Sequence, residues 1–226
     1  MSIAKELIHI SAGKAVIEGA LTIPSHSRGI VIFAHGSGSG RHSPRNNFVA
    51  QILNNSRMAT LLIDLLTPEE DRNYETRFDI DLLAERLVAV TAWIRNSSQT
   101  QHLSIGYFGA STGAAAALKA AVQETSVKAV VSRGGRPDLA GTSLSQVTSP
   151  VLLLVGGHDF SVIELNETAL AQLQCPKTLV IVPGATHLFD EPGTLEQVAH
   201  YAAEWFKAHL SSEYNSPLLS LDKTTS

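Results

Sequence analysis

The sequence predicts an α/β protein built on a mostly parallel, twisted sheet of about 7–8 strands, with helices on both faces. Two observations carry this prediction. Short apolar runs rich in Val, Ile and Leu alternate along the chain with segments whose apolar residues recur at helical spacing. Some of these runs, such as residues 29–36 and 59–66, are apolar at nearly every position, which is typical of strands buried on both faces of a parallel sheet.

The elements follow one another in a regular order. The first two strands are expected to pair antiparallel around the turn Ala12-Gly13-Lys14. Strands are predicted over residues 6–10, 15–23, 29–36, 59–66, 103–110, 127–135, 150–159 and 177–187. Helices are predicted over residues 43–56, 78–97, 111–123, 164–173 and 194–210. Ser43 as N-cap and Pro44 as first helical residue mark the start of the first helix.

The domain organisation is predicted to be simple. The chain has 226 residues, enough for one α/β domain, which we expect to span residues 1–210. Within it there is no linker rich in Pro, Gly or Ser. Residues 211–226 are polar and aperiodic, so they are expected to form a mobile tail.

Composition excludes several classes of partner. A net charge of −4 gives no reason to expect nucleic acid. No apolar stretch approaches roughly 18 residues, so neither a membrane span nor a signal peptide is predicted. The single cysteine, Cys175, excludes an intramolecular disulfide. We therefore expect a cytoplasmic protein, and the sequence carries no signal for its oligomeric state.

Three chemically suited residues follow three different predicted strands. Ser111, Asp159 and His187 should all lie at the carboxyl edge of the sheet, where open parallel sheets bind their ligands. A serine hydroxyl needs a neighbouring base to become nucleophilic, and histidine is suited because its pKa lies near neutrality. A carboxylate on the other ring nitrogen fixes the tautomer of that histidine. The order Ser, Asp, His therefore predicts a catalytic triad.

The stretch "GASTG" suits a sharp turn from strand to helix. Gly109 and Gly113 have no Cβ and leave room for the turn that carries Ser111. The N–H of Thr112 would then be one donor to the oxyanion of a tetrahedral intermediate.

The second oxyanion donor should come from "HGSGSG", which follows the strand over residues 29–36. The N–H of Ser37 is the first choice, and that of Gly38 is the alternative.

The motifs "HGSG", "GASTG", "VGGHD" and "GATH" resemble those of the α/β-hydrolase superfamily, in its dienelactone-hydrolase-like branch. The resemblance covers roughly residues 15–210 and implies the triad Ser111, Asp159 and His187. Dienelactone hydrolases proper use a cysteine nucleophile, whereas this chain has serine, so the resemblance implies a serine-esterase mechanism. Only residues 136–149 separate two predicted strands where other members of the fold insert a cap, so no cap domain is expected.

Several arginines follow the same strand ends. Arg41, Arg133 and Arg136 are candidates for binding a substrate carboxylate or phosphate, since a guanidinium is a planar fork suited to such groups. The alternative is that these arginines, and Arg45 with them, only anchor loops. His35 is expected to hydrogen-bond locally. No spacing typical of a metal site is present, so neither a metal nor a cofactor is predicted.

The sequence thus predicts a serine hydrolase that cleaves a carboxylic ester, lactone or thioester through an acyl-enzyme. Its partner would be a small-molecule acyl substrate, anionic if the arginines bind it. One alternative is a catalytically silent binding protein on the same fold. The other is a nucleotide-dependent oxidoreductase, suggested by "GSGSG", although the spacing G-x-G-x-x-G is not met.

Overall fold

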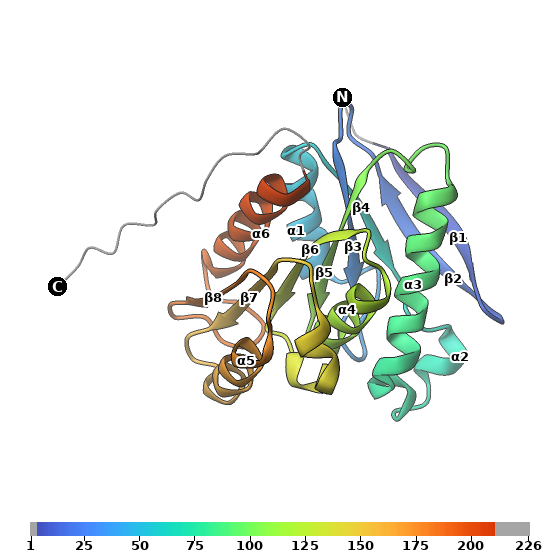
Figure 1. Ribbon diagram of the computed structural model, residues 1–226. Coiled ribbons are helices and arrows are strands. Elements are labelled where there is room, and N and C mark those ends of the chain that lie inside the picture. The colour runs from blue at the N-terminus through green and yellow to red at the C-terminus, as the bar shows by residue number, and fades with distance from the viewer. Residues whose placement is uncertain (1–3, 211–226) are drawn as a thin grey trace.

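The computed structural model describes residues 4–210, and all eight strands in this part of the chain form one sheet (Figure 1). The strand order is β1-β2-β4-β3-β5-β6-β7-β8. β1 and β2 pair antiparallel, as do β2 and β4, and the other neighbours are parallel. The strands are β1 (Lys5–Ala12), β2 (Ala15–Thr22), β3 (Gly29–Ala34), β4 (Met58–Ile63), β5 (Ser104–Ala110), β6 (Val127–Arg133), β7 (Val151–Gly156) and β8 (Lys177–Val182).

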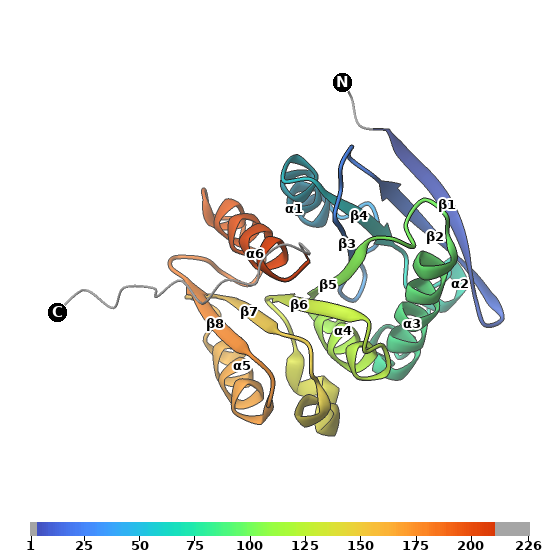
Figure 2. The same cartoon turned by 45° about the horizontal axis from the view of Figure 1, so that its top comes forward.

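Helices cover both faces of this sheet, as Figure 2 shows. One face carries α1 (Pro44–Asn55) and α6 (Thr194–Leu210), and the other carries α3 (Ile80–Asn96), α4 (Thr112–Gln123) and α5 (Phe160–Gln172). Each face has its own apolar core, and both cores share the buried central strands. This arrangement confirms the predicted α/β fold.

Short helical segments are the main feature that the sequence did not predict. The acidic run 69–71 lies in α2 (Pro68–Asp71), where Thr67 and Glu70 cap each other. Glu70 also accepts a hydrogen bond from Arg86 at 2.6 Å. Two 3₁₀ segments, Thr76–Phe78 and Pro137–Gln146, were also unforeseen. The second fills the connection between β6 and β7, which contains no cap domain.

The element boundaries otherwise agree closely with prediction. The main departure is α5, which begins at Phe160, directly after Asp159, rather than near residue 164. The tail predicted over residues 211–226 lies outside the described residues.

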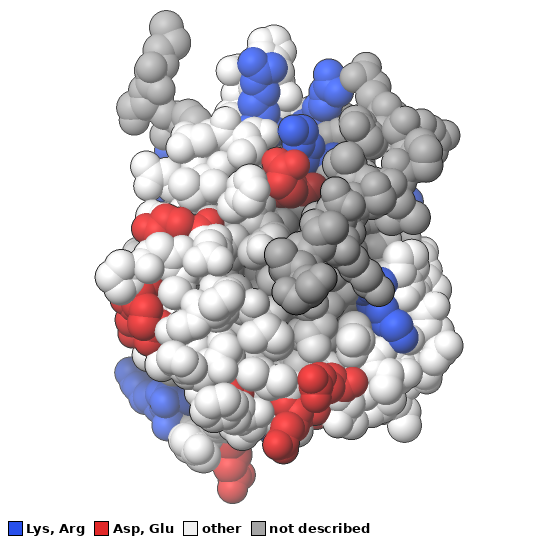
Figure 3. Space-filling view, turned by 90° about the vertical axis from the view of Figure 1, so that its left-hand side faces the viewer, with Lys and Arg blue, Asp and Glu red and all other residues white. Residues whose placement is uncertain are grey.

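The visible surface bears no concentrated charge of one sign. Figure 3 shows the face that carries β8 and α6, on which basic and acidic side chains are scattered among uncharged ones. Among residues 4–210, no helix is long and apolar enough to cross a membrane.

The N-terminal end of α4 packs directly on the backbone of β3. A Cβ on Gly113 would lie 2.3 Å from the carbonyl oxygen of Ala34 and 2.5 Å from that of His35. These are backbone atoms, which cannot swing aside as a side chain can. The close approach brings the start of α4 against the carboxyl ends of the central strands.

Gly113→Ala should therefore lower the free energy of unfolding by at least about 3 kcal/mol, the upper end for overpacking, as measured by chemical denaturation. Gly13→Ala is the control, because Gly13 has φ +66° but a Cβ on it would meet no atom within 4 Å. That variant should lose only about 1 kcal/mol, from backbone strain alone. Equal losses in both variants would show that the close approach at Gly113 is not the constraint.

Candidate active site

Ser111 has an unusual backbone conformation. It lies between β5 and α4 with φ 50° and ψ −122°, a region that residues with a Cβ rarely adopt. Its N–H donates to the carbonyl oxygen of Arg133 at 3.3 Å. Its own carbonyl oxygen accepts from the N–H groups of Ala114 and Arg136, both at 3.1 Å. These hydrogen bonds hold the strained residue in place from three sides.

The space around Ser111 exists because its neighbours are glycines. A Cβ on Gly109 would lie 2.4 Å from the Cα of Ala114, in the first turn of α4. A Cβ on Gly36 would lie 2.9 Å from the Cβ of Ser111. The loop after β3 thus comes directly against the nucleophile turn.

His187 and Asp159 form the hydrogen bond that a triad requires. The Nδ1 of His187 lies 2.6 Å from Oδ2 of Asp159. Asp159 directly precedes α5, and its side chain is 12% exposed, against 40% for His187. Because Asp159 accepts the proton on Nδ1, the Nε2 of His187 is the nitrogen left to act as a base.

The loop that carries His187 is held by Glu191. Its carboxylate accepts hydrogen bonds from the N–H of Thr186 at 3.0 Å and from the Thr186 hydroxyl at 2.6 Å. These hydrogen bonds lower the pKa of Glu191. The residue next to His187 is therefore tied to the loop on its other side.

Ser111 and His187 line the same pocket. It has a volume of about 320 Å³ and lies at the carboxyl ends of β3, β5 and β6. Its walls come from the loop after β3, the start of α1, the nucleophile turn, the end of β6 and the loop after β8: Gly36, Ser37, Gly38, Ser39, Ser43, Arg45, Asn46, Ala110, Ser111, Arg133, Gly134, His187 and Leu188. We call this the Ser111 pocket.

The two predicted oxyanion donors lie beside one another. Thr112 is the first residue of α4, so its N–H has no acceptor within the helix. The N–H of Ser37 donates to the Oγ1 of Thr112 at 3.0 Å. An oxyanion bound by Ser37 would have to share this N–H with that hydroxyl or replace it. Gly38, the alternative, has φ +68° and also lines the Ser111 pocket.

The candidate arginines separate into two groups. The Arg41 side chain pairs with Asp64 and with Glu18, and Arg136 makes two hydrogen bonds to Asp138, at 2.9 and 2.8 Å. Neither of these two arginines lines the Ser111 pocket. The structure therefore places Arg41 and Arg136 where the loop-anchoring alternative expected them, and only Arg133 is a wall of the pocket.

Some wall residues were not singled out from the sequence. Asn46 lies in the first turn of α1, and Gly134 follows β6 with φ +49°. A Cβ on Gly134 would lie 3.6 Å from the Cε1 of His187. The Gly-Gly pair after the predicted strand was a usable signal for Gly134, whereas nothing in the sequence marks Asn46.

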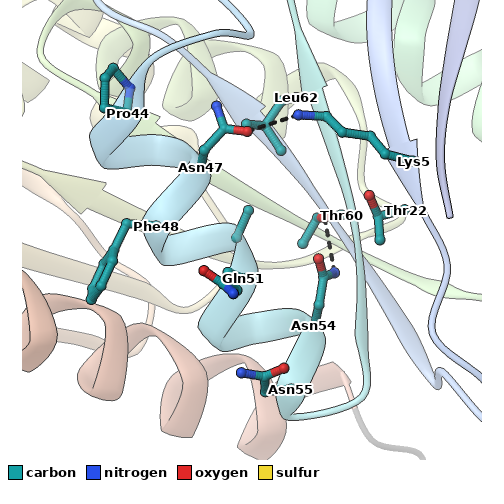
Figure 4. A pocket seen from close by; sticks show the side chains of 11 residues that line it. Lys5, Thr22, Pro44, Asn47, Phe48, Gln51, Asn54, Asn55, Thr60 and Leu62 are labelled. Atoms are coloured by element: carbon teal, nitrogen blue, oxygen red, sulfur yellow. Dashed lines mark hydrogen bonds between the residues drawn. The ribbon is translucent and has the colours of Figure 1, made fainter. Parts of the chain in front are cut away.

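A second cavity lies away from the triad. It has a volume of about 660 Å³ and is lined mainly by α1, β2 and β4 (Figure 4). Lys5 reaches into this region and donates to Asn47 at 2.9 Å. Its other polar walls are amides and hydroxyls, including Gln51, Asn54 and Thr60. It therefore contains no serine, histidine or carboxylate with which to build a second hydrolytic site.

His35 links the ends of two strands. Its Nε2 accepts the N–H of Leu65 at 2.9 Å, and its Nδ1 lies 2.9 Å from the carbonyl oxygen of Gly36. The Nδ1 must therefore carry the proton, and the ring is neutral. This confirms the predicted local role. Among residues 4–210, no group of three His, Cys, Asp or Glu side chains could hold a metal.

The buried, neutral His35 predicts a pH dependence of stability. Burial lowers its pKa below the usual 6.5, despite opposing contributions from Gly36, Asp64 and Asp71. The unfolded chain therefore binds a proton that the folded chain does not, so stability should fall as the pH drops below about 6.5. The slope from this one group should approach about 1.4 kcal/mol per pH unit.

His35→Gln should be less stable at neutral pH but should lose less on acidification than the wild type. Unfolding by denaturant between pH 5 and 8, compared between the two proteins, isolates the contribution of His35. Parallel curves would contradict the assignment of a neutral ring.

Comparisons with known proteins agree with this geometry. The model of the dienelactone hydrolase family matches residues 61–211. A crystal structure of a dienelactone hydrolase from Anabaena variabilis has 54% sequence identity and a TM-score of 0.90, over 92% of this chain and 99% of that one. Est1E from Butyrivibrio proteoclasticus has 19% identity and a TM-score of 0.75, over 89% and 97% of the two chains, and shows the fold alone.

A curated relative from Mycobacterium tuberculosis is named a putative phosphoribosyl transferase. It is 58% identical over 206 residues, which are 91% of this chain but 46% of the relative. The chain therefore spans less than half the length of that protein. The family model and the structure of similar length carry the assignment, and they confirm the resemblance drawn from the sequence: the chain belongs to the dienelactone hydrolase family.

Proposed function

We propose that the protein is a serine hydrolase that cleaves a carboxylic ester, lactone or thioester of a small molecule through an acyl-enzyme. The observation that carries this proposal is the position of Ser111. It is held in a strained turn at the start of α4, in the same pocket as a histidine whose Nδ1 is bound by Asp159. A strained backbone maintained by surrounding packing is typical of a functional residue.

In the first half of the reaction, the Nε2 of His187 takes the proton of the Ser111 hydroxyl as Oγ attacks the substrate carbonyl. The developing negative oxygen accepts the N–H of Thr112 and a second N–H from the loop after β3, that of Ser37. His187 then gives its proton to the leaving oxygen or sulfur, and the acyl group stays on Ser111.

In the second half, His187 takes a proton from water, which attacks the acyl-enzyme. The carboxylic acid leaves, and the proton returns to Ser111. Asp159 stabilises the imidazolium in both halves and keeps the tautomer that has a free Nε2. No cofactor is required by this cycle.

Serine in place of cysteine makes the base essential. A thiol is partly ionised near neutral pH, whereas a serine hydroxyl is not. The 2.6 Å contact between His187 and Asp159 supplies the oriented base that a serine needs. The name of the longer mycobacterial relative describes a protein of which this chain spans 46%, so it gives no competing activity for this chain.

The proposal is tested with 4-nitrophenyl esters of graded acyl length, together with lactones and thioesters. Ser111→Ala should lower kcat by about 10⁶-fold and Asp159→Asn by about 10⁴-fold, the scale seen when triad members are removed. His158→Ala is the matched control, because His158 adjoins Asp159 but is exposed, and only its backbone N–H is engaged, by Ala185.

The control should retain wild-type rates and all four proteins should remain folded. Unchanged turnover in Ser111→Ala would refute the proposed nucleophile. Absence of turnover by the folded wild type across the panel would favour the catalytically silent binding protein.

A further inference from the structure

Arg133 is a buried cation in the wall of the Ser111 pocket. It is the last residue of β6 and pairs in register with Ala110, the residue before Ser111. Only 8% of it is exposed. The nucleophile and this guanidinium therefore come from adjacent strands and open into one cavity.

The guanidinium lacks a countercharge. Its Nη2 donates to the Oδ1 of Asn46 at 3.3 Å, and its Cζ lies 5.9 Å from the centre of the Phe189 ring. Its Nε is buried without any hydrogen-bond partner. Among residues 4–210, no carboxylate lies within 4.0 Å of it, although the side chains of Arg41, Arg45, Arg77, Arg86 and Arg136 all have one.

The carboxylate that acts on Arg133 from a distance is already paired. Asp190 accepts hydrogen bonds from Arg45 at 2.8 and 3.0 Å, and Arg45 also lines the Ser111 pocket. Burial, with repulsion from Arg45, lowers the pKa of Arg133 to about 10, against an opposing effect of Asp190. Arg133 therefore keeps its charge at neutral pH, in a place where an unpaired charge is costly.

The first turn of α1 adds to the positive potential. Ser43 caps this helix, and Ser43, Arg45 and Asn46 are all walls of the pocket. Helix N-termini favour negative charge. The unpartnered guanidinium and the helix terminus thus face the same cavity.

We propose that Arg133 binds an anionic oxygen group of the substrate, a carboxylate or a phosphate, while Ser111 attacks a carbonyl elsewhere in the same molecule. This inference rests on the proposed hydrolase function and names its substrate class: small acyl compounds that carry a negative charge. The bound anion would supply the countercharge that Arg133 lacks.

The kinetic test uses two esters of equal length, mono-4-nitrophenyl adipate and 4-nitrophenyl hexanoate, which differ in the terminal carboxylate. Arg133→Gln should raise the KM for the adipate ester by about 10- to 100-fold, as expected for losing hydrogen bonds to a charged group, and leave that for the hexanoate ester unchanged. Arg133→Lys should recover part of the preference, because it keeps the charge but not the planar fork.

Arg95→Gln is the control. Arg95 lies in α3, and its partner, 3.7 Å away, is Glu124. This variant should keep the wild-type preference for the adipate ester. An equal loss on both esters in Arg133→Gln, or no loss on either, would overturn the proposal.

A binding test works without turnover. Adipate and inorganic phosphate, each compared with sodium chloride at equal ionic strength, should raise the Tm of the wild type but not that of Arg133→Gln. The anion that also inhibits hexanoate hydrolysis competitively identifies whether the natural group is a carboxylate or a phosphate. No Arg133-dependent shift with either anion would count against the site.

The two proposals fail in different ways. Arg133-dependent anion binding without hydrolysis of any ester would refute the hydrolase and keep the anion site. Hydrolysis by Ser111 without a charge preference would do the reverse. Arg133→Met checks for a structural role: its Tm should equal or exceed that of the wild type, because a buried unpaired charge has been removed. A large fall in its Tm would show that Arg133 serves folding and would overturn the proposal.

Discussion

The closeness of α4 to the backbone of β3 and β5 is the constraint on which the rest of the site depends. Only glycine at positions 109 and 113 permits it, because a Cβ at either would lie within 2.4 Å of a backbone atom. The chain then has no room for a relaxed turn, and Ser111 takes φ 50°. That conformation lifts the serine out of the end of the strand and places the first N–H groups of α4 beside it. Packing in the core thus decides the geometry of the nucleophile.

The other parts of the site are each positioned by a different strand end. Asp159 directly precedes α5, and the His187 loop is held by Glu191 through Thr186. The sheet is the common frame, since β3, β5, β6, β7 and β8 are parallel neighbours in that order. Because their carboxyl ends lie along one edge, residues distant in sequence reach a pocket of about 320 Å³. The arrangement explains why a small domain without a cap can assemble a triad.

Much of this could be predicted from the sequence, for a physical reason. Buried parallel strands are continuous apolar runs, and the residues that follow them must lie at one edge, so Ser111, Asp159 and His187 were identifiable. The capped helix α2 was missed because an acidic run of this kind is usually solvated. The roles of the arginines could not be separated either. Arg41, Arg133 and Arg136 all follow strands, but which of them finds a carboxylate depends on loop geometry that no local pattern encodes.

The central claim is that Ser111 is a nucleophile whose oxyanion is bound at the start of α4. The most direct measurement is a crystal structure of the protein after reaction with a fluorophosphonate. The account predicts a single covalent bond to the Oγ of Ser111, with the phosphonyl oxygen accepting the N–H of Thr112. An adduct on another residue, or an adduct on Ser111 whose oxygen points away from Thr112, would contradict it.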